Sequence, residues 1–85
     1  MLKLLKQSFS KILFEKRIEL KYSQEVMAEK CCISTRQYTD LEHGLRLPSF
    51  QTFINITIAF EIDYNVFLAS LIRQGYKVPD KKLNN

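Results

Sequence analysis

A chain of 85 residues with 46% hydrophobic content is long enough for one domain with one apolar core. Only two Gly and two Pro interrupt long stretches of good helix formers, which favours an all-helical domain over a sheet. The net charge of +4 permits a polyanionic partner without proving one, and two cysteines are too few for the disulfide framework of a secreted protein.

The charge is unevenly distributed along the chain. Residues 1–21 carry six Lys or Arg against two acids, residues 73–85 carry four against one, and residues 22–72 carry three against six. Basic ends therefore flank a mildly acidic middle. The leading apolar run is broken at Lys6 and Gln7, too short for a signal sequence or a membrane span, so we expect a cytoplasmic protein without membrane association.

Apolar period and capping residues predict five helices. The first runs from about residue 7, or from an earlier residue, to Leu20. Residues 1–7 either form an N-terminal extension or continue this helix, since their leucines extend its apolar stripe. One face of this helix holds Phe9, Leu13, Lys16, Arg17 and Leu20.

Serine caps predict the next two helices. Ser23 is a good N-cap for a short second helix, whose inner side holds Met27, Ala28 and Cys31. Ser34 opens the third helix with a capping box, in which its hydroxyl accepts from the Gln37 backbone while the Gln37 side chain reaches back. Gly44 supplies the left-handed stop.

Pro48 and Ser49 restart the chain into a fourth helix over residues 50–61, where the length and spacing favour helix although Thr and Ile would also suit a strand. Asp63 caps a fifth helix over residues 64–74. The inner faces of the two helices hold Phe53, Ile56, Thr57, Phe60, Tyr64, Phe67, Leu68 and Leu71. These helices complete a domain over residues 8–73, followed by a basic, flexible tail, residues 74–85.

The second and third helices, joined by residues 31–33, form a helix-turn-helix unit, whose second helix usually presents its outer face to DNA. With Tyr38 and Leu41 inward, helical geometry turns four side chains to the opposite side and leaves Thr35 at the exposed N-terminal end. The four are Arg36, Thr39, Asp40 and His43. Arg, Thr and Asp hydrogen-bond base edges, Arg to guanine and Asp to the cytosine amino group.

One carboxylate of the third helix is predicted to be buried. Glu42 lies about 40° from the inward direction of Tyr38, where an unpaired charge is costly. Its natural partner is Arg17, the cation on the inner stripe of the first helix. We therefore predict an ion pair between Arg17 and Glu42 that ties the helix-turn-helix to the first helix.

Residues 17–63 resemble, without a gap, the phage-repressor or Cro-like helix-turn-helix family, also called the XRE family. The resemblance covers roughly residues 8–72. The matching features are Arg17, Ser23 with Gln24, Ala28, Ile33 with Ser34, Leu41 with Glu42, Gly44 and Pro48.

The resemblance implies a compact five-helix, lambda-repressor-like domain that binds double-stranded DNA sequence-specifically, generally as a homodimer, with the third helix in the major groove. The base contacts it implies are Thr35, Arg36 and Asp40, with Thr39 as a weaker candidate. The phosphate contacts it implies are Gln24, Ser34, Gln37 and Arg46. Arg17 and Glu42 match the family's buried salt bridge.

This chain departs from the family at three glycine positions. Cys32 replaces the glycine of the turn, where a left-handed conformation costs a non-glycine residue on the order of 1 kcal/mol, so we expect a slightly rearranged turn. Lys21 and Glu61 take similar glycine positions. Asp40 near the bases repels phosphate, which predicts modest affinity or strict sequence choice.

Alternative interpretations accompany several of these residues. A metal site at Cys31 and Cys32 would need four ligands, and His43 is the only histidine, so a turn is favoured and no metal or cofactor is expected. A redox sensor stays open if Cys32 is exposed. The outward face of the third helix could be an ordinary solvated surface. Without a nucleophile, base and orienting group, an enzyme is not expected.

Apolar residues off the core stripes suggest a partner surface. Phe14 and Ile18 lie on the outer side of the first helix, and the alternative is that the N-terminal leucines or the tail, through Tyr76 and Val78, cover such residues. The candidates for a homodimer interface are Ile54, Ile58, Tyr64, Leu68 and Ile72.

The leading hypothesis is a transcriptional regulator, specifically a repressor, that binds a pseudo-palindromic DNA site as a homodimer. The alternative is a protein-interaction module on the same fold, motivated by the acidic middle and the surplus isoleucines. An antitoxin, which binds both DNA and a partner protein, would combine the two.

Overall fold

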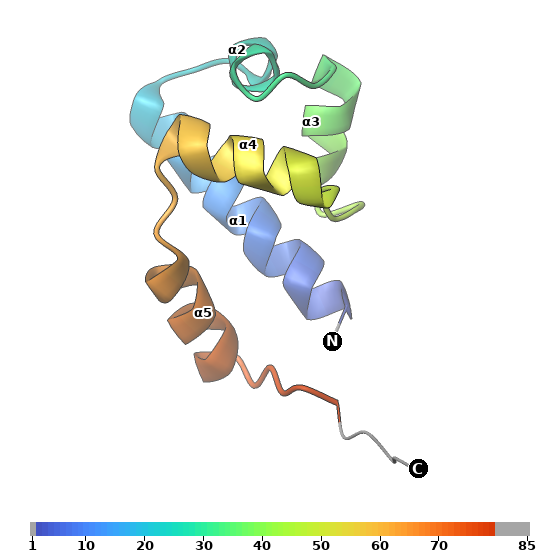
Figure 1. Ribbon diagram of the computed structural model, residues 1–85, viewed down its shortest axis with the longest axis vertical. Coiled ribbons are helices and arrows are strands. Elements are labelled where there is room, and N and C mark those ends of the chain that lie inside the picture. Colours follow the sequence, from blue (N-terminus) through green and yellow to red (C-terminus); the bar gives the residue numbers. More distant parts are fainter. Residues whose placement is uncertain (1, 80–85) are drawn as a thin grey trace.

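The computed structural model describes residues 2–79, which form five α-helices without a strand in that range. In chain order the helices are α1 (Leu2–Leu20), α2 (Gln24–Lys30), α3 (Thr35–Glu42), α4 (Phe50–Phe60) and α5 (Tyr64–Arg73) (Figure 1). The all-α class with a helix-turn-helix at α2 and α3 is confirmed. The first helix begins at Leu2, which is the earlier of the two starts considered, so residues 2–7 continue α1.

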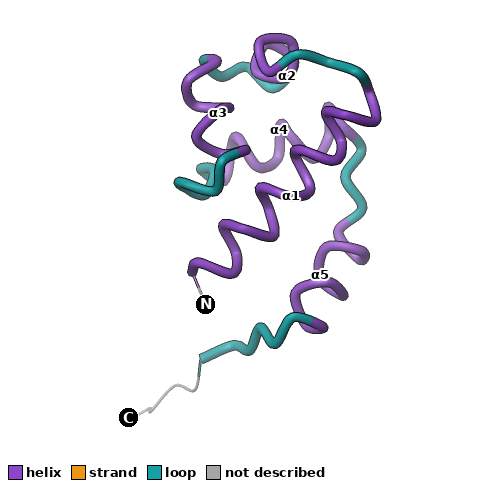
Figure 2. The backbone as a smooth tube through the Cα atoms, turned by 180° about the vertical axis from the view of Figure 1, so that it is seen from behind, coloured by secondary structure: helices purple, strands orange, loops and turns teal. Residues whose placement is uncertain are grey.

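The longest helix, α1, organises the arrangement. It contacts both α3 and α5, while α2 packs on α3. Figures 1 and 2 show α4 crossing α1, with α2 and α3 at one end of the molecule and α5 at the other. The helix-turn-helix therefore projects from one end of the domain, with its back held by α1.

The predicted N-caps Ser23, Ser34 and Asp63 each accept a backbone N–H of the helix they open, and Ser49 does the same for α4. The capping box is complete, because the Gln37 N–H donates to Ser34 Oγ at 3.1 Å and the Ser34 N–H donates to Gln37 Oε1 at 2.9 Å. These bonds satisfy backbone donors that have no partner within a helix. They fix the first residue of α3 and so the angle of its outer face.

The turn between α2 and α3 has a non-glycine residue in the left-handed conformation. Cys32 has a φ of 62°, and the Ile33 N–H closes the turn on the Ala28 carbonyl at 3.1 Å. Cys32 therefore takes the left-handed conformation that glycine favours, at the steric cost expected of a residue with a Cβ. Lys21 and Glu61 are also left-handed, with φ of 60° and 52°.

The core lies where α1, α2, α3 and α4 meet. Its buried members are Phe9, Leu13, Met27, Ala28, Cys31, Tyr38, Leu41, Ile56 and Phe60. Rings of Phe53, Phe67 and Tyr64 extend it toward α5 in edge-to-face and tilted contacts that begin at Phe9. Leu68, expected on the inner face of α5, is instead exposed, because α5 packs through its Phe67 and Leu71 side.

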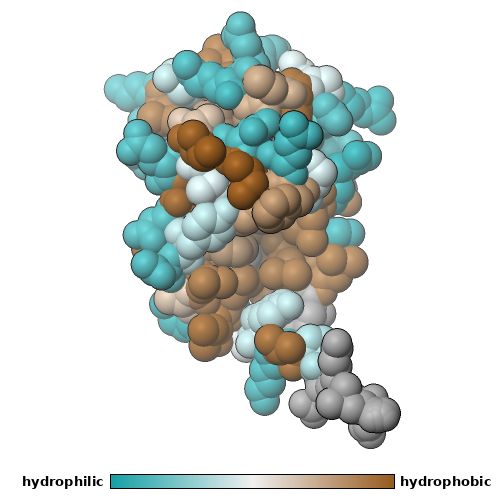
Figure 3. Space-filling model, in the orientation of Figure 1, coloured by the Kyte–Doolittle hydropathy of each residue, from teal (hydrophilic) through white to brown (hydrophobic). Residues whose placement is uncertain are grey.

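Helices α4 and α5 are rich in apolar residues on both sides. Figure 3 shows brown, hydrophobic side chains gathered over the middle and lower part of this face, whereas teal, hydrophilic ones are most frequent at the end that carries α2 and α3 and along the edges. Within residues 2–79 no single helix has the length and apolar character to cross a membrane. Only α4 and α5 taken together do, and the chain bends by 115° between them.

Candidate nucleic-acid interface

The buried ion pair between α1 and α3 is present in the structure. Arg17 Nε donates to Glu42 Oε1 at 2.7 Å and Nη2 donates to Oε2 at 3.0 Å, a bidentate arrangement. The Glu42 side chain is only 4% exposed. Such pairing is needed because a carboxylate buried without a partner is strongly unfavourable.

Glu42 also accepts two further side-chain donors. Tyr38 Oη donates to Oε1 at 2.8 Å, and Gln24 Nε2 donates to Oε2 at 3.0 Å. Burial by itself would raise the pKa of Glu42, but the hydrogen bonds from Arg17, Gln24 and Tyr38 together hold it below its ordinary value. The same carboxylate therefore joins α1, the start of α2 and the inner face of α3.

Burial and this carboxylate also affect the phenol of Tyr38. Burial, reinforced by the hydrogen bond to Glu42, raises the pKa of Tyr38 above its ordinary range, so the phenol stays protonated and remains a donor. The hydrogen bond to Glu42 raises the pKa of Arg17 as well. The inner side of α3 is thus held in one charge state at neutral pH.

The outer face of α3 carries the predicted base contacts. Thr35 and Arg36 are exposed, Thr39 is half-buried, and His43 is exposed just beyond the helix. Thr39 Oγ1 donates to Gln24 Oε1 at 3.2 Å. The structure therefore connects a predicted base contact to a predicted phosphate contact, a link that helical arithmetic on α3 alone could not find.

Asp40 and Arg46, assigned separately to bases and to phosphate, lie together. Arg46 Nη2 is 3.4 Å from Asp40 Oδ2, and the Asp40 side chain is 18% exposed. Gly44, with a φ of 73°, turns the chain back after α3 and brings Arg46 alongside the helix. The negative charge of Asp40 is consequently partly neutralised at the face it shares with Arg36.

A shallow cleft between α3 and the start of α4 adds two polar residues that the sequence reasoning missed. Ser49 and Thr52 line it beside Gln37 and Arg46, together with the apolar side chains of Ile33, Leu41 and Leu47. Ser49 caps α4 and accepts the Thr52 N–H at 3.1 Å. A serine cap is a signal in the sequence, but its proximity to Gln37 depends on the loop from Gly44 to Ser49.

Ser34 and Gln37, the predicted phosphate contacts at the start of α3, serve only as hydrogen-bond acceptors in the capping box. Ser34 Oγ and Gln37 Oε1 each accept one backbone N–H. The hydroxyl proton of Ser34 and the amide protons of Gln37 are therefore not consumed by this box. Both groups are donors of the kind that phosphate oxygens accept.

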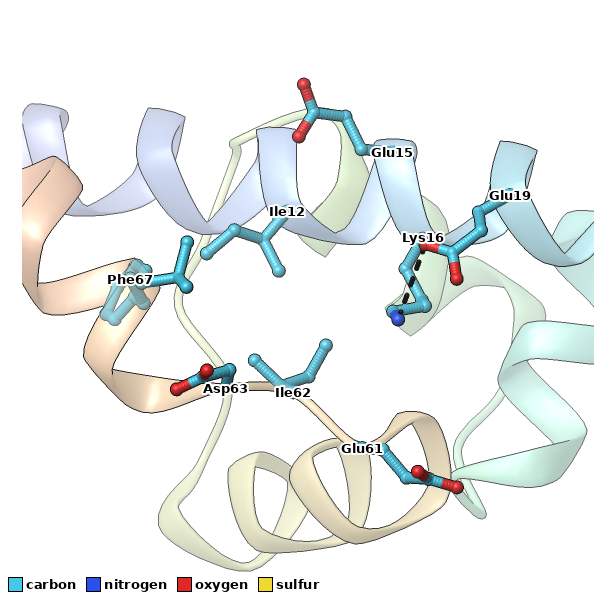
Figure 4. Close-up of a pocket in the computed structure, with 9 residues that line it drawn as sticks. Ile12, Glu15, Lys16, Glu19, Glu61, Ile62, Asp63 and Phe67 are labelled. Atoms are coloured by element: carbon cyan, nitrogen blue, oxygen red, sulfur yellow. Dashed lines mark ion pairs between the residues drawn. The ribbon is translucent and has the colours of Figure 1, made fainter.

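Acidic side chains collect on another side of the domain. Figure 4 shows Glu15, Glu19, Glu61 and Asp63 around a pocket between α1 and the α4–α5 turn, where Lys16 pairs with Glu19 at 3.5 Å. In Figure 1 that turn lies on the opposite side of α1 from α3. Carboxylates repel a phosphate backbone, so the electrostatics favour an approach of DNA from the α3 side.

The two cysteines occupy different environments. Cys31 is buried, and burial raises the pKa of its thiol to about 11, which keeps it protonated. Cys32 is exposed at the turn. Within residues 2–79 no group of three or more His, Cys, Asp or Glu side chains is placed to hold a metal ion.

Most of the predicted interface candidates on α4 and α5 are exposed. Ile58 is 72% and Ile72 70% exposed, and Ile54 and Leu68 are also accessible. Tyr64 is half-buried, with its hydroxyl 2.8 Å from Thr57 Oγ1. Phe50, which the sequence reasoning did not include, is more exposed than any of these.

The alternative was that the N-terminal leucines or the tail cover these exposed apolar residues, and the described residues at both ends of the chain give it little support. Val78 is 82% exposed, and Leu2 at the other end of the chain is 56% exposed. Tyr76 is half-buried, with its N–H on the Leu71 carbonyl at the end of α5. Residues 80–85 of the predicted tail lie outside the described range.

Comparison with known protein families agrees with this geometry. The sequence profile described as helix-turn-helix, of the XRE type, matches residues 13–67, which include the end of α1, all of α2, α3 and α4, and the start of α5. The chain therefore belongs to the XRE-type helix-turn-helix family, a family of DNA-binding transcription regulators. Searches of curated proteins and of solved structures give no significant match.

Proposed function

We propose that this protein is a transcriptional repressor that binds a specific double-stranded DNA sequence with α3 in the major groove. The observation that carries the proposal is the fixed outer face of α3. Thr35 and Arg36 are exposed on it, while its inner side is held to α1 by Glu42 and Arg17. A helix held in this way can present side chains to base edges at a defined angle.

In this proposal the residues divide into two groups by the part of DNA they contact. Thr35, Arg36, Thr39 and Asp40 face bases, with Arg36 suited to bidentate recognition of guanine. Gln24, Ser34, Gln37 and Arg46 contact phosphates, and Ser49 and Thr52 extend that group at the start of α4. The N-termini of α2 and α3 add backbone N–H donors.

The proposal includes a homodimer, because a two-fold symmetric DNA site matches a two-fold symmetric protein. The exposed apolar residues of α4 and α5 support it: Ile54 and Ile58 lie one helical turn apart on α4, as do Leu68 and Ile72 on α5. Two recognition helices would then lie about 34 Å apart, one turn of B-DNA. Repression would follow from covering a promoter.

Selection of bound sequences from random duplex DNA tests this function. We expect an enriched pseudo-palindrome, bound with an affinity that falls steeply as salt rises because counterions are released. Arg36→Ala should weaken binding by about 1 to 3 kcal/mol and relax the choice of one base pair in each half-site. Arg73→Ala, which removes an exposed arginine on α5, is the matched control. Failure to enrich any sequence would refute the proposal.

A second candidate is a protein-interaction module, or an antitoxin that combines both activities. The acidic pocket beside the α4–α5 turn and the exposed isoleucines favour it. Salt dependence separates the two, since a hydrophobic protein interface does not weaken steeply with salt as DNA binding does. An interaction that survives high salt and is lost on Ile58→Ser with Ile72→Ser would support this candidate.

A further inference from the structure

Thr39 is connected to the buried ion pair by a chain of hydrogen bonds whose direction is fixed. The chain runs from Thr39 through Gln24 to Glu42, with Thr39 Oγ1 to Gln24 Oε1 at 3.2 Å and Gln24 Nε2 to Glu42 Oε2 at 3.0 Å. Thr39 lies on the outer side of α3 and is half-buried, whereas Glu42 is buried. The chain therefore reaches from the core to the surface that faces DNA in the proposed complex.

The charge of Glu42 decides which end of the Gln24 amide faces inward. An ionised carboxylate only accepts hydrogen bonds. Burial opposes ionisation of Glu42, but the bidentate pair with Arg17 and the hydrogen bonds from Gln24 and Tyr38 outweigh it and hold the pKa of Glu42 below its ordinary value. Gln24 must therefore turn Nε2 toward Glu42 and Oε1 toward Thr39. The reverse orientation would place two acceptors, Oε1 and Oε2, against each other.

The orientation of Gln24 in turn decides how Thr39 can bond. A threonine hydroxyl has one proton and normally serves as donor or acceptor. Here its proton is directed to Gln24 Oε1, so toward a new partner Thr39 Oγ1 can only accept. In the major groove the donors are the amino groups of adenine and cytosine, whereas guanine O6 and thymine O4 are acceptors.

We propose that Gln24 and Glu42 are positioning residues that make Thr39 an obligate acceptor, so that Thr39 selects a base bearing a major-groove amino group, adenine or cytosine, and rejects guanine O6 or thymine O4. This inference rests on the proposed DNA-binding function. It raises Thr39 from a weak contact to a determinant of specificity, and it gives the buried ion pair a role in recognition besides holding α3.

The first experiment compares sequence selection by the wild type with selection by Thr39→Val, which keeps the shape and removes the hydroxyl. We expect one base pair in each half-site to lose its preference, with about a threefold to tenfold loss of affinity for the selected site. Thr39→Ser retains the hydroxyl and should retain the preference. Thermal melting of each variant confirms that it is folded before binding is measured.

The second experiment identifies the base atom at that position. Adenine is replaced by purine, or cytosine by 2-pyrimidinone, so that only the exocyclic amino group is removed. The wild type should lose affinity about threefold to tenfold, and Thr39→Val should lose nothing more, because hydroxyl and amino group form a single interaction. Equal losses for both proteins, or no loss for the wild type, would overturn the assignment.

The third experiment tests the positioning role of Gln24. Gln24→Met removes the acceptor and frees the Thr39 proton, so Thr39 should now tolerate a carbonyl oxygen at the same base pair while other positions keep their preference. A role for Gln24 limited to phosphate would lower affinity uniformly over all sequences. That uniform loss would refute the proposed role of Gln24 and leave the DNA-binding function intact, whereas failure of the wild type to select any sequence would refute the function itself.

Discussion

Replacing Glu42 by glutamine tests the central feature of the fold, the carboxylate that joins α1, α2 and α3. Glu42→Gln keeps the size of the side chain but leaves Arg17 without its counter-charge in a largely buried place, where the Arg17 side chain is 18% exposed. Breaking a fully buried ion pair costs about 3 to 5 kcal/mol. Because Arg17 retains some access to water, we expect about 2 to 4 kcal/mol.

That loss is a large fraction of the free energy of unfolding expected for a domain of this size. At about 0.05 to 0.15 kcal/mol per residue the free energy of unfolding is roughly 4 to 13 kcal/mol. The variant should therefore melt at least about 10 °C lower. Urea unfolding followed by circular dichroism gives the free energy directly, provided that the slope with denaturant is unchanged.

A matched control uses the ion pair between Lys16 and Glu19 on α1, in which the Lys16 side chain is 22% exposed and the carboxylate is mostly in water. Lys16→Met removes the partner of Glu19, whose side chain is 67% exposed, and should cost less than about 1 kcal/mol. A double-mutant cycle with Arg17→Met and Glu42→Gln should then give a coupling free energy between the two residues, whereas the corresponding cycle for Lys16 and Glu19 should give none. The reasoning is refuted if Glu42→Gln costs no more than Lys16→Met.

The remaining predictions concern pH, the turn and the face of α3. The pKa of Glu42 is lower in the folded state than in the unfolded state, so its contribution to stability is present above about pH 4.3 and is lost as the pH falls through the pKa of the folded state. When stability is measured as a function of falling pH, Glu42→Gln should lack the part of the loss that is due to this carboxylate. Burial raises the pKa of Cys31 to about 11 and raises that of Tyr38 as well. The stability that these protonated groups contribute should therefore be fully present below about pH 9 and be lost as the pH rises toward 11. A urea midpoint that does not change between about pH 8 and about pH 10.5 would contradict this prediction. Cys32→Gly should stabilise by about 0.5 to 1 kcal/mol in thermal melts because Cys32 has a φ of 62°, whereas Cys32→Ala, which keeps the strain, should not. Asp40→Asn removes the ion-pair partner of Arg46 and a charge that repels phosphate, so binding to any duplex should tighten. The slope of log affinity against log salt should steepen by about 0.9, because Arg46 can then contact one more phosphate. An unchanged slope would show that Arg46 does not reach DNA.

The helices and their caps could be predicted from the sequence because they depend on residues close together in the chain. Ser23, Ser34, Ser49 and Asp63 each open a helix as expected. Gly44 follows the end of α3 at Glu42 and is left-handed, as predicted for a stop signal. The sequence left the start of α1 open, because no capping residue marks it, and the structure begins the helix at Leu2. Leu68 was placed inward because the stripe on α5 is wide, and only packing against α1 decides which part of it is buried.

The candidate site was predictable in its parts and less so in their connections. Arg17 and Glu42 could be paired from the sequence because each falls on the inward stripe of its own helix, so a common core brings them together. The contact of Asp40 with Arg46 depends on how the loop after α3 turns back. The contact of Thr39 with Gln24 depends on how α2 lies on α3. The helical period of the sequence contains no information on either.

The sequence by itself thus determined five helices, a helix-turn-helix unit and a carboxylate that had to find a cation, because capping, period and the cost of a buried charge are local or nearly local quantities. Only the tertiary structure decided that this carboxylate also binds Gln24 and Tyr38, and that Cys32 holds a left-handed turn. It alone placed the acids beside the α4–α5 turn, apart from α3. These outcomes depend on the relative placement of whole helices, which is fixed by the packing of the core.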